Sequence, residues 1–167
     1  MAKNVIWAAV FSLAAILLQS TLFLHISLYN TIPDFTLGII VYSAYVNGVM
    51  TGQVTGFFSG LLLDLVSNAP LGLNALIRTI MGAAAGLLKG TFFLDAIFLP
   101  MILCAAATLF KAFMFFVFHL LLSGAVPAYS LAAPTLWIEL FLNTISAPFL
   151  FGLLKLFRPL LAGKGDN

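Results

Sequence analysis

Residues 35–66 read FTLGIIVYSAYVNGVMTGQVTGFFSGLLLDLV, and this stretch decides the fold. Asp64 is the only charged residue among these 32. One helix of that length would be about 48 Å long at 1.5 Å per residue, which exceeds the roughly 30 Å apolar core of a bilayer. Asn47-Gly48 and Gly52 offer a turn in the middle. The stretch therefore predicts two short consecutive membrane helices, over residues 34–49 and 52–66.

The rest of the chain has the same character. Its 167 residues include seven Lys and Arg and five Asp and Glu, together 7%, where soluble domains carry about 25%. So few charges cannot cover a water-soluble fold, and 63% apolar residues exclude disorder. The lone Cys104 excludes a disulfide scaffold, and the scattered basic residues exclude a nucleic-acid binder. The composition predicts an all-α polytopic membrane helical bundle, with residues 1–167 forming a single transmembrane domain.

Breaks at Pro, Gly and Asn and isolated charges divide the apolar runs into six predicted transmembrane helices, of which the second and third are short. Their expected ranges are 5–24, 34–49, 52–66, 72–88, 97–122 and 134–157. We expect the last helix to bend or break near Pro148, because proline removes a helical hydrogen bond.

Six spans place both termini on the same side of the membrane. The basic residues that then share the cytoplasmic side, as the positive-inside rule requires, are Lys3, Lys89, Lys155, Arg158 and Lys164. A five-span alternative also keeps Lys89 and the C-terminal residues inside, and only Lys3 argues against it. We therefore expect both termini in the cytoplasm.

Glycines at a spacing of four mark the third and fourth predicted helices. They are Gly52, Gly56 and Gly60, and then Gly82, Gly86 and Gly90. For a Leu side chain, contact with a lipid tail is as favourable as contact with another Leu. Membrane helices therefore associate through small residues that let their backbones approach. The two stripes predict a tight hairpin, closed by a turn at residues 69–72. In a second interpretation, one stripe docks a helix of a partner protein.

Charges within predicted spans are costly, so they are usually paired or functional. Those in or at the edges of the spans are Asp64, Arg78, Lys111 and Glu139, whereas Asp34 and Asp95 mark helix boundaries. We expect an Asp64–Arg78 pair across the hairpin and a Lys111–Glu139 pair between the fifth and sixth helices. These pairs either hold helices together or form a polar docking site for a partner helix or a small ligand.

The sequence carries no sign of an enzyme. His25 and His119 have no metal-ligand spacing around them, and zinc-protease, serine-nucleophile and phosphate-loop motifs are absent. In the predicted topology Asp64 and Asp95 lie on opposite sides of the membrane, so they cannot act as an acid/base pair. We expect no catalytic residue, cofactor or metal site.

Two adjoining segments resemble a known family signature. Residues 55–67, TGFFSGLLLDLVS, and residues 70–76, PLGLNAL, are similar to the signature of MreD, the rod shape-determining membrane protein family of bacteria. The Pro-Asp-Phe that opens an aliphatic helix at residues 33–35 and the chain length also resemble this family. The family motif includes Gly56, Gly60, Asp64 and Gly72 and assigns them no chemistry.

The resemblance implies a non-enzymatic scaffold of the cell-elongation machinery in the cytoplasmic (inner) membrane. MreD family members bind MreC and connect the MreB filament inside to RodA and its class B penicillin-binding transpeptidase outside. The expected partners are these proteins and the lipid bilayer. The alternative is a substrate-binding S-component of an energy-coupling-factor vitamin transporter, with a ligand pocket. Its candidate pocket residues are Asn74, Trp137, Glu139 and Asn143.

Overall fold

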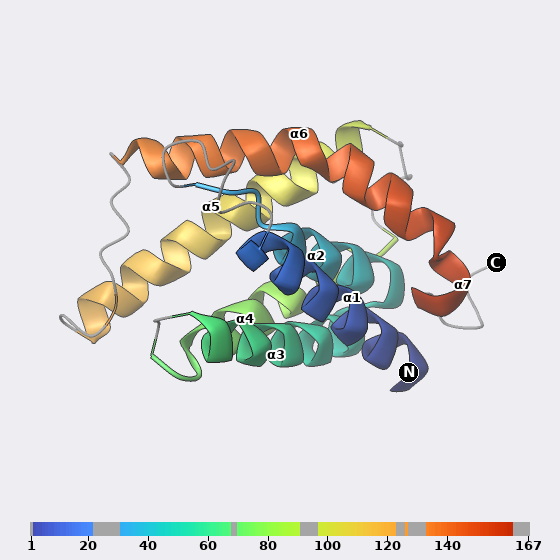
Figure 1. Ribbon diagram of the computed structural model, residues 1–167, viewed down its shortest axis with the longest axis horizontal. Coiled ribbons are helices and arrows are strands. Elements are labelled where there is room, and N and C mark those ends of the chain that lie inside the picture. The colour runs from blue at the N-terminus through green and yellow to red at the C-terminus, as the bar shows by residue number, and fades with distance from the viewer. Residues whose placement is uncertain are drawn as a thin grey trace.

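The protein is an all-α, polytopic membrane bundle (Figure 1). The computed structural model describes residues 2–21, 31–67, 70–90, 97–122, 126 and 133–161. Its helices are α1 (Ala2–Thr21), α2 (Phe35–Asn47), α3 (Val49–Val66), α4 (Leu73–Leu87), α5 (Phe98–Leu121), α6 (Pro134–Leu156) and α7 (Arg158–Leu161). In these described residues α1, α3, α5 and α6 are long and apolar enough to cross a membrane, whereas α2 and α4 are shorter apolar helices.

The long apolar run that predicted two helices is broken at a single residue. α2 ends at Asn47 and α3 begins at Val49, with Gly48 between them at φ 93°. This left-handed conformation strains any side chain with a Cβ, so glycine suits the break. Because one residue makes the turn, α3 starts before Gly52 and reaches 18 residues. The two shorter spans are α2, with 13 residues, and α4, with 15.

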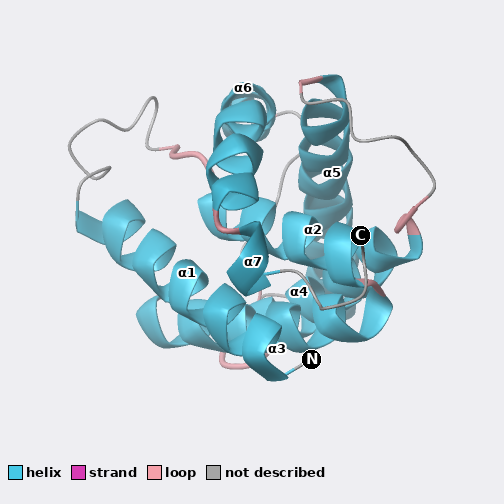
Figure 2. Cartoon of the chain, turned by 90° about the vertical axis from the view of Figure 1, so that its right-hand side faces the viewer, coloured by secondary structure: helices cyan, strands magenta, loops and turns pink. Residues whose placement is uncertain are grey.

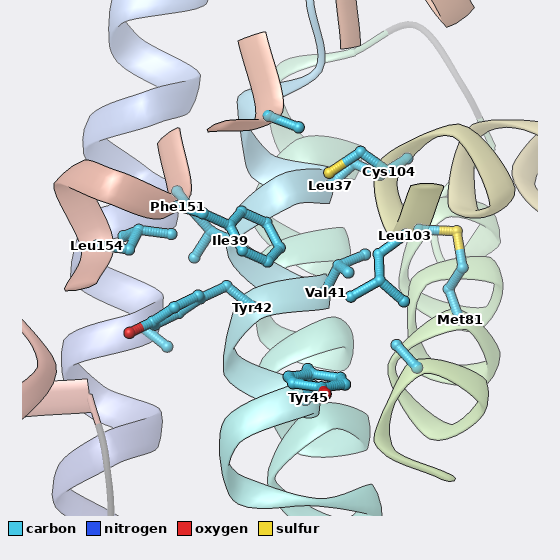
Figure 3. Close-up of a cluster of buried hydrophobic side chains, with 14 of the residues drawn as sticks. Leu37, Ile39, Val41, Tyr42, Tyr45, Met81, Leu103, Cys104, Phe151 and Leu154 are labelled. Carbon is cyan, nitrogen blue, oxygen red and sulfur yellow. The ribbon is translucent and has the colours of Figure 1, made fainter. Parts of the chain in front are cut away.

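α2 lies at the centre of the bundle. None of its residues is exposed, residues 36–45 are all buried, and it packs against α1, α3, α4, α5 and α6. In Figure 3, Tyr42 lies beside Phe151 of α6, and Val41 points the other way, toward Leu103 of α5. A helix that is enclosed on all sides needs an apolar surface all round, which explains the nearly continuous apolar sequence of α2.

The ends of several helices meet where α2 stops. The Asn4 side-chain amide donates to Asn47 Oδ1 at 2.9 Å, which ties the start of α1 to the end of α2. Asn47 Nδ2 in turn donates to the Leu161 carbonyl at 2.8 Å, so the short α7 is held against this end of the bundle (Figure 2). The opposite end of α2 begins at Asp34, and the charged residues gather there.

Candidate functional site: a buried charge cluster beside a polar cavity

The glycine stripes join α3 to α4 backbone to backbone. A Cβ added at any of five glycines would clash with atoms of the facing segment: Gly52, Gly56 and Gly60 on α3, and Gly82 and Gly86 on α4. At Gly60, for example, it would lie 2.5 Å from Ala75 Cα. The predicted hairpin between α3 and α4 is therefore present. Gly90 takes no part, because it lies in the turn after α4 with φ 74° and nothing near it.

This packing brings Arg78 into the centre of the protein. A Cβ at Gly56 would meet the Arg78 carbonyl, so the α4 backbone lies directly against α3 at this point. The Arg78 residue is only 2% exposed. Its Nη2 donates to the carboxylate of Asp34, at 3.1 Å to Oδ1 and 2.8 Å to Oδ2. Arg78 therefore pairs with the residue that opens α2.

The predicted Asp64–Arg78 pair is wrong, because Asp64 caps α4. Its carboxylate accepts hydrogen bonds from the backbone N–H groups of Gly72, Asn74 and Ala75, at 3.0, 3.1 and 3.1 Å. It also accepts the Asn74 side-chain amide at 2.9 Å. The first N–H groups of a helix have no partner within the helix, and a negative charge is favourable there. Since Gly72 has no side chain to cap the helix, Asp64 supplies the cap from the end of α3.

Lys111 and Glu139 form the expected ion pair between α5 and α6. Lys111 Nζ also donates to Asp34 Oδ2 at 3.2 Å. The four charges thus alternate in the order Arg78, Asp34, Lys111 and Glu139, and their sum is zero. Their side chains are at most 12% exposed. Alternation lets each charge be neutralised by a neighbour, which reduces the cost of burying it.

Besides its ion pairs, Asp34 is held in place by hydrogen bonds with residues of α2 and α6. Its Oδ1 accepts the Leu37 N–H at 3.0 Å, which makes it the N-cap of α2. Its own N–H donates to Asn143 Oδ1 on α6 at 2.6 Å, and Asn143 Nδ2 donates to Thr108 Oγ1 on α5 at 3.0 Å. Sequence reasoning placed Asp34 only at a helix boundary. A signal in the sequence could have identified Asp34 as an ion-pair partner. It is an acidic residue at the start of a helix, in a chain with two basic residues, Arg78 and Lys111, inside its predicted spans.

A cavity of about 340 Å³ adjoins this charge cluster. Besides the four charged residues it is lined by Gln19, Thr31, Ile32, Pro33, Leu63 and Thr135. Its volume is within the range of small-ligand sites, although a cavity of this size can also receive a few residues of another protein. Among the described residues, Arg78 Nε and Nη1 are buried and have no hydrogen-bond partner.

The other residues considered from the sequence lie elsewhere. His119 Nδ1 is 2.8 Å from the Val126 carbonyl, at the end of α5. Within the described ranges no three His, Cys, Asp or Glu side chains are grouped so that they could hold a metal ion. His25, Ala69, Asp95 and Lys164 lie outside the described residues.

Comparison with protein families identifies the chain. Residues 1–157 match the family model of the rod shape-determining protein MreD. The chain belongs to the MreD family. Neither a curated protein nor a solved structure matches it significantly. As a member of the MreD family the protein has a role in determining rod shape, and its apolar helices make it a membrane protein.

The residues that resemble the family signature can now be described in physical terms. Gly56 and Gly60 let α4 lie directly on α3, and Gly72 turns the chain so that Asp64 reaches the start of α4. These residues build the hairpin that carries Arg78 to the charge cluster. These residues therefore position the charge cluster, although none of them belongs to it.

Proposed function

We propose that this MreD-family protein is a non-enzymatic adaptor of the rod-elongation complex. It binds MreC and so links the MreB cytoskeleton to RodA and its class B penicillin-binding transpeptidase. It lies in the cytoplasmic membrane with both termini in the cytoplasm. The orientation is supported by the four exposed charged side chains of the described residues, which are all basic: Lys3, Lys89, Lys155 and Arg158.

The polar cavity beside Asp34 is the observation that carries the proposal. Polar and ionisable groups inside a membrane are expensive, and they mark binding sites or pathways when they line a cavity. Here, the uncharged polar residues Gln19, Thr31 and Thr135 line the same cavity as a cluster whose charges cancel. Such a site can hold a segment of another membrane protein by hydrogen bonds and shape. We propose that MreC docks here with a segment close to its transmembrane helix.

Co-purification with full-length MreC, followed by an affinity measurement in nanodiscs, tests the proposal. We expect Thr135→Trp, which fills the cavity, to weaken MreC binding by about tenfold or more, equivalent to at least about 1.4 kcal/mol. The matched control is Ile145→Trp on the same helix, where the side chain is 49% exposed and does not line the cavity. This control keeps the affinity of the wild-type protein. Cells with Thr135→Trp as the only copy are expected to become round.

Three outcomes would contradict parts of this proposal. If the wild-type protein does not bind MreC, the adaptor function is wrong. If Thr135→Trp binds as tightly as Ile145→Trp, MreC docks elsewhere. If the purified protein retains a vitamin tightly, the S-component of a vitamin transporter becomes the better assignment.

A further inference from the structure

We propose that the end of the bundle around Asn47 and Gly48 binds the headgroups of anionic phospholipids through a basic collar of four exposed side chains. The members of the basic collar are Lys3, Lys89, Lys155 and Arg158. This inference goes beyond the adaptor function and does not depend on the binding of MreC.

Contacts at the end of α2 bring the basic collar together, although its members are far apart in the sequence. The Asn4 amide donates to Asn47, so the neighbouring Lys3 lies at this end of the bundle. A Cβ added at Gly48 would lie 3.4 Å from Lys89 Cδ, so the Lys89 side chain lies over the turn between α2 and α3. Asn47 also donates to a carbonyl of α7, which holds the junction of α6 and α7, with the other two basic residues, at the same end (Figure 1).

Positive charge is in excess at this end of the protein. The described carboxylates lie toward the opposite ends of their helices: Asp34 before α2, Asp64 near the end of α3 and Glu139 near the start of α6. The other acidic residues of the sequence are Asp95 and Asp166, so the four cations outnumber them. Each Lys or Arg near an anionic membrane surface strengthens the attraction by about fivefold. The basic collar therefore favours an anionic ligand.

Large apolar side chains lie exposed beside the basic residues, and they identify that ligand as a lipid. Trp7 is exposed on α1 and follows Lys3 at a spacing of four, which places the two side chains on one face of the helix. Leu156 follows Lys155 and is exposed, and so is the leucine before Lys89. Tryptophan is enriched at the boundary between membrane and water. The basic collar thus lies at the level of the headgroups, where a phospholipid meets the cations with its phosphate and the apolar side chains with its acyl chains.

The two tryptophans of the sequence allow the two ends of the bundle to be compared in one experiment. Trp7 is 36% exposed beside the basic collar, whereas Trp137 is 57% exposed near the start of α6, at the opposite end. The full-length Trp137→Phe variant therefore reports on the basic collar alone. The matched control, Trp7→Phe, reports on the other end. Each variant is reconstituted in vesicles in which a brominated phospholipid, which quenches tryptophan on contact, competes with an unbrominated one.

We expect the lipid around Trp7 to be phosphatidylglycerol in preference to phosphatidylcholine by about fivefold or more. In the control, the preference at Trp137 stays within about twofold of one. Changing all four basic residues to glutamine should remove the preference at Trp7; the substitutions are Lys3→Gln, Lys89→Gln, Lys155→Gln and Arg158→Gln. About 0.5 M sodium chloride should lower it without any change in the basic collar, because salt screens exposed charges, so this measurement does not depend on the folding of the four-residue variant.

Three results would overturn the proposal. The first is equal quenching of Trp7 by the two brominated lipids. The second is the same preference at Trp7 and Trp137, because lipid charge would then be recognised by the whole bundle and not at this end. The third is no preference for phosphatidylglycerol together with binding of a polyglutamate peptide that the four-residue variant loses, which would assign the basic collar to an acidic protein. Failure to bind MreC counts only against the adaptor function.

Discussion

Asp34 is the residue on which the charge cluster depends. Its carboxylate caps α2 through the Leu37 N–H and contacts two cations, Arg78 and Lys111. Lys111 also contacts Glu139, whereas Asp34 is the carboxylate that contacts Arg78 among the described residues. Loss of the Asp34 charge would leave a buried guanidinium without a counter-ion.

We predict that Asp34→Asn lowers the free energy of unfolding by about 3–5 kcal/mol, because one partner of a buried ion pair is removed and the other remains. Chemical or thermal unfolding in detergent measures the change. The Asp34→Asn/Arg78→Gln double variant is expected to be more stable than the sum of the single losses predicts. If Asp34→Asn lowers the free energy of unfolding by less than about 1 kcal/mol, the Asp34–Arg78 ion pair stabilises the protein no more than a solvent-exposed ion pair does.

A second pair of substitutions is the control for this coupling. Asp64 and Arg78 make separate sets of hydrogen bonds in this structure. The losses caused by Asp64→Asn and Arg78→Gln should therefore add to within about 0.5 kcal/mol in the double variant. Strong coupling between them would contradict the geometry described here.

At the level of the element, α3 and α4 behave as one unit because their backbones touch. The contact at Gly56 sets the distance of Arg78 from the axis of α3. Any side chain inserted there pushes α4 away from α3, and Arg78 moves with α4. The packing of the hairpin and the geometry of the charge cluster are therefore linked.

We predict that Gly56→Ala destabilises the protein by about 1–3 kcal/mol, because overpacking forces the backbone to shift. It should also weaken MreC binding, since Arg78 is displaced. The matched control is Gly152→Ala on α6, where an added Cβ would have nothing within 4 Å. That control is expected to gain up to about 1 kcal/mol, because alanine is the better helix former. Equal effects of the two substitutions on unfolding would show that the α3–α4 contact is looser than described.

At the scale of the whole molecule, the charges are separated along the bundle. Every exposed charged side chain of the described residues is basic, and Lys3, Lys89 and Lys155 lie near the starts or ends of helices that meet around Asn47 and Gly48. The described carboxylates are buried or half-buried. This separation gives the bundle one basic end, which the positive-inside rule places in the cytoplasm.

Labelling of single cysteines tests this topology. Cys104 is the only cysteine in the sequence and is buried, so Cys104→Ala provides the background. With a maleimide that cannot cross the membrane, we predict that intact cells label Leu71→Cys, in the turn between α3 and α4, but not Lys3→Cys or Lys155→Cys. All three positions are exposed. Labelling of Lys3→Cys in intact cells would favour the five-span arrangement, with the N-terminus outside.

Much of the fold could be predicted because helix breaks are local. Gly48, Pro134 and the glycine spacing specify where helices stop, start and touch, and the structure has helices in all the expected places. The Lys111–Glu139 pair could be anticipated because α5 and α6 are consecutive. The Asp34–Arg78 pair could not, since the two residues are 44 positions apart and meet only through the packing of α2.

Asp64 was a reasonable but incorrect partner for Arg78, and the reason is physical. Proximity across a hairpin favours the pair, but the same carboxylate is also close to the unpaired N–H groups that start α4. Three of these N–H groups and one amide bind Asp64 in the structure. A sequence pattern shows which charges are near each other and does not show which backbone groups compete for them.

The position of α2 has a consequence for how the protein is made. At 13 residues it is about 20 Å long, shorter than the apolar core of a bilayer, and none of its residues is exposed to lipid in the finished bundle. Of the helices that enclose it, only α1 precedes it along the chain; α3, α4, α5 and α6 follow. When α2 leaves the ribosome, its Asp34 has neither Arg78 nor Lys111 to neutralise it. We therefore expect stable insertion of α2 to wait for the later helices, so that the part of the chain after α2 completes the centre of the bundle.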